Sequence, residues 1–233
     1  MLEIGTGWGG LALHAAREHG CRVTTTTISR EQHDMARARV RAAGLEHRID
    51  VIFEDYRDLR GSYDKLVSIE MLEAVGAQYL RDYFQQCARL LKPDGLLLVQ
   101  SIVIADHAFA HASTDVDFLK KYIFPGSCLP SVGAIAAASG TTDLRTLHVE
   151  DIGPHYCLTL RRWREAFRRN LDRVRALGFD ARFVRMWDYY FSYCEGVFST
   201  HHTSDVQWLW GKPGFTAPLP AVVPEGTVAW RAH

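Results

Sequence analysis

Residues 2–10 of this 233-residue chain read LEIGTGWGG. An acidic residue, an apolar residue and a Gly-x-Gly-x-Gly run predict a short strand that turns sharply into a helix. Gly5 and Gly7 can adopt backbone angles closed to other residues, and they allow a ligand to approach the main chain. The stretch therefore predicts a loop that binds a nucleoside-like ligand.

Strand and helix signals alternate downstream of this loop. Strands are expected at residues 2–4, 22–27, 50–54, 63–69, 96–104, 146–152 and 203–211, and helices at 10–18, 29–43, 77–91, 158–177 and 182–198. This alternation predicts an α/β fold with a doubly wound, mostly parallel sheet of seven strands, whose ligand lies at the carboxyl ends of the strands.

The rhythm breaks at about residues 105–145, which we interpret as a helical or irregular insertion over the active-site face. Residues 1–211 are expected to form one domain, and residues 212–233, with four of the eight prolines, an irregular tail. Arginines crowd residues 161–175; such a run is usually a solvated face, although it can also meet anionic lipid head groups.

Composition excludes several classes of protein. The formal net charge is zero, which argues against a nucleic-acid binder. No apolar run approaches about 20 residues, so no transmembrane helix is expected. The five cysteines are widely spaced without a CxxC pair, which disfavours metal and disulfide sites and fits a reducing cytoplasm. Because the chain opens inside a structural motif, no signal peptide is expected.

The glycine loop is compatible with either of two kinds of cofactor. Residues 5–10 match the dinucleotide string GxGxxG, but such a site also needs an acid at the end of the second strand. Here that strand ends TTTTIS at residues 24–29, without an acid. The leading Glu3 and the closing Gly-Trp-Gly-Gly fit an S-adenosylmethionine (SAM) loop better, because SAM has no pyrophosphate to bind.

Several strings together resemble the cyclopropane-fatty-acyl-phospholipid synthase and mycolic acid cyclopropane synthase family of class I SAM-dependent methyltransferases. The resemblance runs in order over residues 2–211, and the string at 121–131 is its most specific part. The strings are GWGG at 7–10, TISREQ at 27–32, DYRD at 55–58, SIEMLEAVG at 68–76 and KYIFPGSCLPS at 121–131. Full-length members begin with a helical domain that we expect this chain to lack.

The resemblance implies which residues bind SAM. Those of the loop are Glu3, Gly5, Thr6, Gly7 and Gly9. The segments implied to meet the ribose and adenine contribute Thr27, Ile28, Gln32, Asp55, Tyr56 and Arg57.

The resemblance also implies a bicarbonate ion as proton acceptor, held by Glu73, Tyr156 and the backbone of Ile102, with Cys194 at the active site. Gln100 stands where members often carry a histidine, so the titratable group is lost there, although an amide can still hydrogen-bond the ion. Since two anions repel, we expect Glu73 to be protonated beside bicarbonate, or a cation to lie near.

Each of these residues also has a purely structural reading. Glu73 can be an acid favoured at a helix start, Tyr156 a core tyrosine, and Cys194 a small buried hydrophobe, which is the commoner case. The aromatic run at 187–198 is typical of a helix face that packs in a core. Methyl transfer to an alkene would leave a carbocation, and an apolar, aromatic pocket would keep water from it and stabilise it.

The predicted reaction is methyl transfer from SAM to the cis double bond of a phospholipid acyl chain, followed by cyclopropane closure. A methyl-branched lipid product, a small-amine acceptor, and an inactive SAM-binding fragment are the alternatives. We expect a cytoplasmic protein that contacts the membrane surface transiently and binds neither metal nor nucleic acid; a homodimer is compatible with the resemblance.

Overall fold

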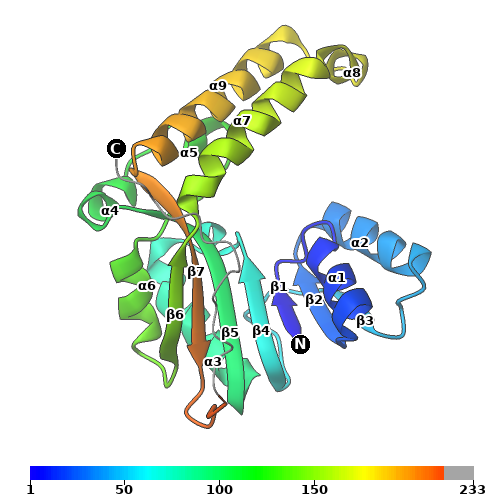
Figure 1. Cartoon of the computed structure of the whole chain (residues 1–233), viewed down its shortest axis with the longest axis vertical. Helices are drawn as coiled ribbons and strands as arrows, with labels where there is room; N and C mark the ends of the chain where they lie inside the picture. The colour runs from blue at the N-terminus through cyan, green and yellow to red at the C-terminus, as the bar shows by residue number, and fades with distance from the viewer. Residues whose placement is uncertain (218–233) are drawn as a thin grey trace, which may run out of the picture.

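A computed structural model describes residues 1–217 of the chain. It contains one seven-stranded sheet in the order β3-β2-β1-β4-β5-β7-β6 (Figure 1). The strands are β1 Leu2–Ile4, β2 Val23–Thr27, β3 Ile49–Phe53, β4 Tyr63–Ile69, β5 Leu91–Ile104, β6 Arg145–Asp151 and β7 Thr203–Gly211. Strands β1 to β5 pair in parallel, and β7 runs antiparallel between β5 and β6. The expected doubly wound, mostly parallel sheet is confirmed.

The helices that cover the sheet begin near the expected residues, except the last of them, which lies in the segment interpreted as an insertion. They are α1 Gly10–His19, α2 Arg30–Ala42, α3 Leu80–Leu90 and α6 Val132–Ser139, with short 3-10 turns η1 Leu72–Ala74 and η2 Ala77–Tyr79. Ser29 caps α2, because its side chain accepts a hydrogen bond from the backbone N–H of Gln32, as is usual for a serine at a helix start.

Strand β5 begins at Leu91, five residues before the strand expected at 96–104. Tyr63 pairs with Leu91 and Lys65 pairs with Leu96, so between these pairs one residue of β4 lies opposite four residues of β5. The Lys-Pro-Asp-Gly segment therefore bulges out of the ladder, which lets the strand begin earlier than its sequence suggests.

The insertion expected at 105–145 divides into two parts. Helices α4 Asp106–Ala112 and α5 Phe118–Tyr122 follow the carboxyl end of β5. The chain then returns to the sheet, where Ser131 bridges to Ile104 and caps α6. Helix α6 buries Ile135 beside α3, so this last part belongs to the layer that covers the sheet and not to the active-site face.

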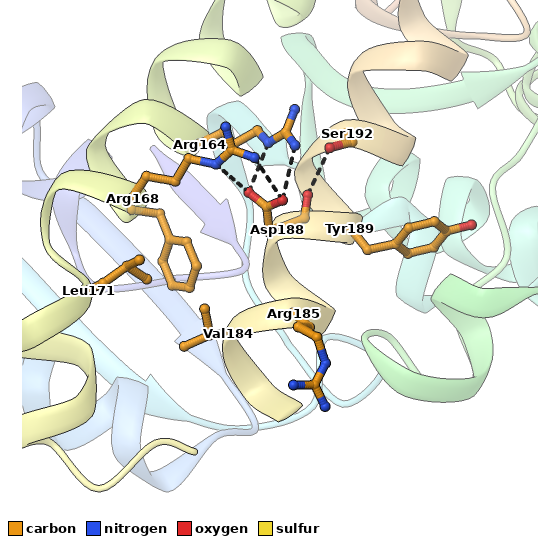
Figure 2. Close-up of a pocket in the computed structure, with 9 residues that line it drawn as sticks. Arg164, Arg168, Leu171, Val184, Arg185, Asp188, Tyr189 and Ser192 are labelled. Carbon is orange, nitrogen blue, oxygen red and sulfur yellow. Dashed lines mark hydrogen bonds and ion pairs between the residues drawn. The ribbon is translucent and has the colours of Figure 1, made fainter. Parts of the chain in front are cut away.

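A larger insertion separates β6 from β7. It consists of α7 Gly153–Arg169, α8 Leu171–Ala176 and α9 Ala181–Ser199, which form a helical hairpin projecting beyond the carboxyl edge of the sheet (Figure 1). Helix α7 begins five residues before its expected start, because Pro154 occupies its first turn, where no N–H is needed. Asp188 of α9 binds both Arg164 and Arg168 of α7 and so locks the two helices together (Figure 2).

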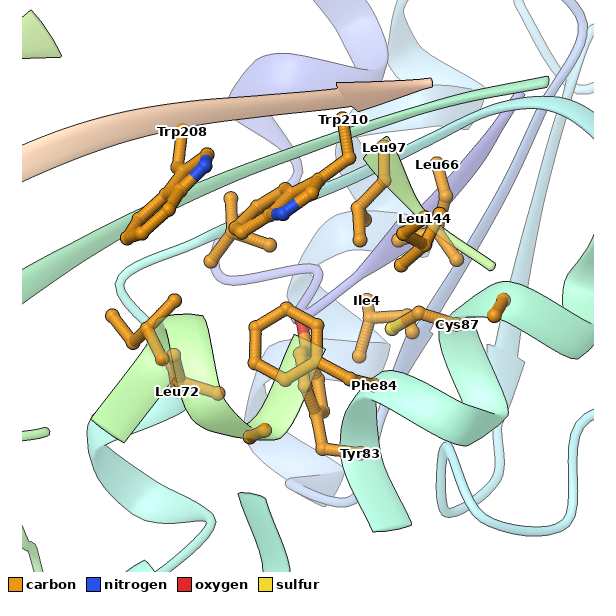
Figure 3. Close-up of a cluster of buried hydrophobic side chains, with 14 of the residues drawn as sticks. Ile4, Leu66, Leu72, Tyr83, Phe84, Cys87, Leu97, Leu144, Trp208 and Trp210 are labelled. Carbon is orange, nitrogen blue, oxygen red and sulfur yellow. The ribbon is translucent and has the colours of Figure 1, made fainter. Parts of the chain in front are cut away.

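The main hydrophobic core lies between the sheet and α3 (Figure 3). The rings of Phe84 and Trp210 meet edge to face at 5.3 Å, and Trp208 stacks on Trp210 at 4.9 Å. A separate cluster packs α1 and α2 on β2 and β3. Among the described residues, no helix is both long and apolar enough to cross a membrane.

Candidate functional site

A cavity of about 420 Å³ opens at the carboxyl ends of β1 and β2. Strand order reverses between β1 and β4, and the crevice at such a switch point is where α/β sheets bind ligands. Its walls come from the glycine loop, the end of β2, the start of α2, the segment after β3 and the η1–η2 region. The lining residues are Ile4, Gly5, Thr26, Thr27, Ile28, Ser29, Gln32, Glu54, Asp55, Tyr56, Arg57, Met71, Ala74, Val75 and Tyr79.

The glycine loop forms the floor of this cavity. Gly5 has φ +98°, and a Cβ at this position would lie 3.2 Å from Cγ of Met71. Its backbone N–H and that of Thr6 both donate to the carbonyl oxygen of Thr26. Gly9, at φ +80°, allows α1 to pass close to Ala36 of α2. The loop needs its glycines for backbone geometry and for close approach.

Glu3 lies beneath the loop rather than in the cavity. Thr25 donates from Oγ1 to its carboxylate at 2.6 Å, and Thr25 and Thr6 share a 2.7 Å hydrogen bond. Burial raises the pKa of Glu3 to about 7. Glu3 and Thr6 therefore hold the loop in place through Thr25, and do not touch the cavity themselves.

The outer wall is fixed by a contact that the sequence did not reveal. The side-chain amide of Gln86, from α3, donates to the carbonyl oxygens of Tyr56 at 2.9 Å and Leu59 at 3.1 Å. Arg57 bridges back to Asp55 through Nε and Nη2. These bonds pin the loop after β3 at the cavity mouth.

Seven of the eleven residues predicted to bind the cofactor line the cavity. They are Gly5, Thr27, Ile28, Gln32, Asp55, Tyr56 and Arg57. Glu3, Thr6, Gly7 and Gly9 shape the loop beside it. Sequence reasoning missed eight lining residues, all of which lie at the end of a predicted strand or between that strand and the first turns of the next helix, and this position was the available signal. They are Ile4, Thr26, Ser29, Glu54, Met71, Ala74, Val75 and Tyr79.

A second polar group gathers beside Met71, at the carboxyl ends of β4 and β5. Glu73 accepts hydrogen bonds at Oε1 from the backbone N–H of Ile102 at 2.5 Å and from Ser101 Oγ at 2.9 Å. Its Oε2 is buried and has no hydrogen-bond partner among the described residues. Burial and, second, the charge of Glu70 raise the pKa of Glu73 to about 7.

Gln100 joins two further carboxylates. Its Nε2 donates to Oε1 of Glu70 at 2.8 Å and to Oδ2 of Asp205 at 3.0 Å, while its Oε1 accepts from Nε2 of Gln207 at 2.8 Å. Asp205 is fully buried, and burial together with the charge of Glu70 raises its pKa to about 8. Glu70 is exposed and has φ +54°, a backbone conformation that is costly for a residue with a side chain.

Tyr156 and Cys194 lie on the hairpin above these carboxylates. Burial and then the charge of Glu70 raise the pKa of Tyr156. Its ring stacks on Phe198 at 4.9 Å. Cys194 is buried in the aromatic cluster at the hairpin base, which raises the pKa of its thiol to about 12. The structure thus brings all five residues predicted for catalysis into one region, and adds Glu70 and Asp205.

The bicarbonate site that the resemblance implies stays a prediction, because in this structure the donors implied to hold the ion bond to carboxylates. The Ile102 N–H expected to hold the ion is engaged by Glu73, and the Gln100 amide donors are engaged by Glu70 and Asp205. Three carboxyl groups converge here, and the raised pKa values of Glu73 and Asp205 favour their neutral forms, which lessens the repulsion of a further anion. Glu73 has the raised pKa that we expected for it, but burial is the largest cause.

The specific string at 121–131 lies next to the same region. The backbone N–H of Cys128 donates to the carbonyl oxygen of Glu73 at 2.8 Å, and that of Ile104 donates to Pro130. The ring of Phe124 lies 6.1 Å from that of Tyr190 on the hairpin. The string therefore ties η1 and β5 to the insertion.

Strand order, glycine loop and cavity together define the class I SAM-dependent methyltransferase fold. The sequence profile of the family described as mycolic acid cyclopropane synthetase matches residues 1–208, and the chain belongs to this family.

Two curated relatives are similar over most of the chain. The tuberculostearic acid methyltransferase UfaA1 of Mycobacterium tuberculosis is 42% identical over 209 residues, which are 89% of this chain and 49% of that protein. The cyclopropane-fatty-acyl-phospholipid synthase of Escherichia coli K12 is 37% identical over 216 residues, covering 90% and 51%. The chain thus spans about half the length of these relatives.

Solved structures agree on the fold. The cyclopropane synthase MmaA2 from Mycobacterium tuberculosis superposes with a TM-score of 0.83 at 22% identity, covering 91% of this chain and 77% of that one. The mycolic acid cyclopropane synthase CmaA1 complexed with SAH and CTAB gives the same score at 23% identity and the same coverage.

Proposed function

We propose that this chain transfers the methyl group of SAM to a cis double bond in the acyl chain of a membrane phospholipid, and that a cyclopropane ring closes after loss of a proton. The observation that carries the proposal is that the cofactor cavity lies beside the group of carboxylates. Met71 lines the cavity, and the neighbouring residue Glu70 belongs to the carboxylate group. Two relatives that are more than a third identical support it, one named a tuberculostearic acid methyltransferase and the other a cyclopropane-fatty-acyl-phospholipid synthase.

The cavity residues suit SAM. Backbone groups of the glycine loop and the neutral side chains of Thr27 and Gln32 would hold it without a pyrophosphate-binding site, and Asp55 would accept from its hydroxyl or amino groups. SAM supplies an electrophilic methyl group on a sulfonium centre. The alkene forms the new C–C bond as the S–C bond breaks, which leaves a carbocation on the acyl chain.

The hairpin base would exclude water from this cation. Phe191, Tyr190 and Trp187 pack around Cys194 there, and aromatic faces stabilise cations. The carboxylate of Glu70 adds negative charge at the same end of the sheet. The aromatic run is thus both a local core and a wall of the proposed acceptor site.

The proton must leave from the newly added methyl group for the ring to close. A bicarbonate ion, as the resemblance implies, is one possible acceptor, and it would have to displace the carboxylates that now accept from Ile102 and Gln100. Glu70 is the exposed carboxylate of the group, bridged by Gln100 to buried Asp205, and it is the acceptor that the geometry favours. The C–H electron pair forms the third C–C bond of the ring while the proton passes to Glu70.

A methyl-branched product is the second candidate, favoured by the 42% identity to a tuberculostearic acid methyltransferase. It shares methyl transfer and the carbocation but not ring closure. We place the reaction at the cytoplasmic surface of a membrane, with transient contact. A homodimer remains a prediction.

The decisive experiment incubates the protein with methyl-labelled SAM and vesicles of a cis-unsaturated phospholipid, followed by analysis of the fatty-acid methyl esters. Label in a chain that has gained one CH2 and lost its double bond as a ring supports the proposal. Label in a branched chain selects the second candidate. Label only in an added amine, or in no product, contradicts both and supports the amine acceptor or the inactive fragment.

A further inference from the structure

The distal half of the helical hairpin, residues 164–192, differs in charge from the rest of the chain. The hairpin from 153 to 199 carries nine arginines, no lysine and five acidic residues, while the whole chain has no net charge. It therefore has an excess of four positive charges that the remaining residues balance. It also projects away from the sheet, with α8 at its far end (Figure 1).

A pocket of about 420 Å³ lies between α7 and α9 in this distal half (Figure 2). Asp188 binds Arg164 through Nε and Nη2 at 2.9 and 3.0 Å, and Arg168 through the same atoms at 2.7 and 2.9 Å. These arginines hold the pKa of Asp188 well below its usual range. One carboxylate thus fixes two guanidinium groups, and the site keeps a positive charge.

Both arginines retain donors beyond those spent on Asp188. A guanidinium has five N–H donors in a planar fork, which matches the oxygens of a phosphate. Arg185 lines the same pocket and extends away from Asp188 in Figure 2, and within residues 1–217 it forms no ion pair. Phe167, Leu171 and Val184 form an apolar wall beside these cations.

The turn between α8 and α9 exposes large apolar side chains next to further arginines. Leu177 is 76% exposed and Phe179 is 44% exposed. Arg182 follows on the first turn of α9 and is exposed, without an ion pair among the described residues. Exposed apolar residues flanked by cations favour the boundary between phospholipid head groups and acyl chains.

We propose that this distal half, the hairpin docking surface, binds anionic phospholipids of a membrane, with a lipid phosphate in the pocket of Arg164, Arg168 and Arg185 and the Leu177–Phe179 turn inserted among the acyl chains. The inference rests on the proposed lipid substrate and assigns its membrane contact to one surface. Charge complementarity selects the occupant: a second copy of this hairpin would repel the first.

The surface also lies in line with the proposed reaction site. Asp188 and Cys194 are on the same helix, six residues apart, which is about 9 Å along its axis. A lipid held by its phosphate at the pocket would therefore have the aromatic cluster at the hairpin base within reach of its acyl chain. Docking and reaction would use neighbouring parts of one helical hairpin.

The test measures binding to vesicles and needs neither SAM nor turnover. The protein is titrated with vesicles of equal parts dioleoyl phosphatidylglycerol and phosphatidylcholine, and with vesicles of phosphatidylcholine alone. We expect binding to the anionic vesicles that weakens with salt. Replacing Arg182 or Arg185 by Gln should weaken it about five-fold each, and Leu177→Asp should weaken it further.

Matched controls lie on α2, which is distant from the hairpin in Figure 1. Arg37→Gln removes an exposed arginine and Met35→Asp places an acid at a half-exposed apolar residue, so both should bind as the original protein does. Hydrogen exchange should slow in residues 164–192 on adding anionic vesicles. Sedimentation of each variant shows whether self-association has changed.

Equal binding to both kinds of vesicle, or hairpin variants that bind like the α2 controls, would overturn the inference. Exchange protection confined to another surface, or a hairpin substitution that changes only the oligomeric state, would overturn it too. The proposed function is tested separately, with phospholipid dispersed in detergent. A protein that methylates this phospholipid but does not bind anionic vesicles would support the proposed function and contradict the docking surface.

Discussion

The side-chain amide of Gln100 on β5 donates a 3.0 Å hydrogen bond to the carboxylate of Asp205 on β7. The same nitrogen donates to Glu70 at the end of β4, so one neutral amide holds two acids together. Gln207 orients that amide by donating to its oxygen. The network therefore joins residues of β5 and β7 and the end of β4 into one site.

Gln100→Leu should destabilise the protein by about 1–3 kcal/mol, because it removes the donors of a buried acid. Gln207→Leu removes only one bond to Gln100 and should cost less. Denaturant unfolding measures both variants. An equal or larger loss in Gln207→Leu would show that the amide does not carry the network.

Stability should fall as the pH rises toward 8. Asp205, with a pKa raised from 3.8 to about 8, binds its proton more tightly in the folded than in the unfolded state. Its contribution is therefore fully present below about pH 4 and lost as the pH passes 8. Glu73 and Glu3, raised to about 7, act in the same direction.

Asp205→Asn should flatten this decline, since the amide does not titrate. Urea unfolding at a series of pH values gives the slope, and Asp172→Asn, at a fully exposed side chain, serves as the control. A slope unchanged in Asp205→Asn would mean that Asp205 titrates normally.

Gly5→Ala should weaken SAM binding about ten-fold, because a left-handed backbone costs a side chain roughly 1–2 kcal/mol and the new Cβ would press on Met71. Gly10→Ala is the matched control, since nothing lies within 4 Å of its Cβ position. Calorimetric titration compares the two. Similar SAM affinities of the two variants would contradict the placement of Gly5 at the floor of the cofactor cavity.

Cys194 should resist alkylation. Its buried thiol has a pKa of about 12, so little thiolate exists at neutral pH. Mass spectrometry after iodoacetamide treatment of the folded protein should find the partly exposed Cys21 and Cys128 labelled first. Early labelling of Cys194 would instead identify a reactive residue.

Turnover should not depend on added bicarbonate, because the donors expected to hold it already bind Glu73, Glu70 and Asp205. Initial rates in carbon-dioxide-depleted buffer, with and without bicarbonate, measure this. Glu70→Gln should abolish product formation while leaving SAM affinity near that of the original protein. Stimulation by bicarbonate would restore the ion as proton acceptor.

The residues around the cofactor cavity could be predicted from the sequence because the signals for them are local. The glycine loop and the Ser29 cap lie within short stretches whose backbone geometry depends on neighbouring residues. Strand ends at one edge of a parallel sheet then gather by topology alone. Thr27 and Asp55, from different strands, were placed together for this reason.

The carboxylate network could not be predicted in the same way. Glu70 and Asp205 are far apart in sequence, and they meet only because β7 inserts antiparallel beside β5. One sequence shows the polar residues of each strand but not which strands pair. Periodicity predicts helices in the hairpin, although the one expected at 158–177 is divided into α7 and α8. The charged pocket depends on how α7 and α9 pack, which periodicity does not show.

The cofactor cavity and the proposed acceptor site are built from successive parts of the chain, which has an evolutionary consequence. Every residue that lines the cofactor cavity falls between Ile4 and Tyr79. Apart from Glu70 and Glu73, the groups facing the proposed acceptor follow residue 99. Recombination at the β5 bulge can therefore exchange one acceptor specificity for another while the donor site is inherited whole.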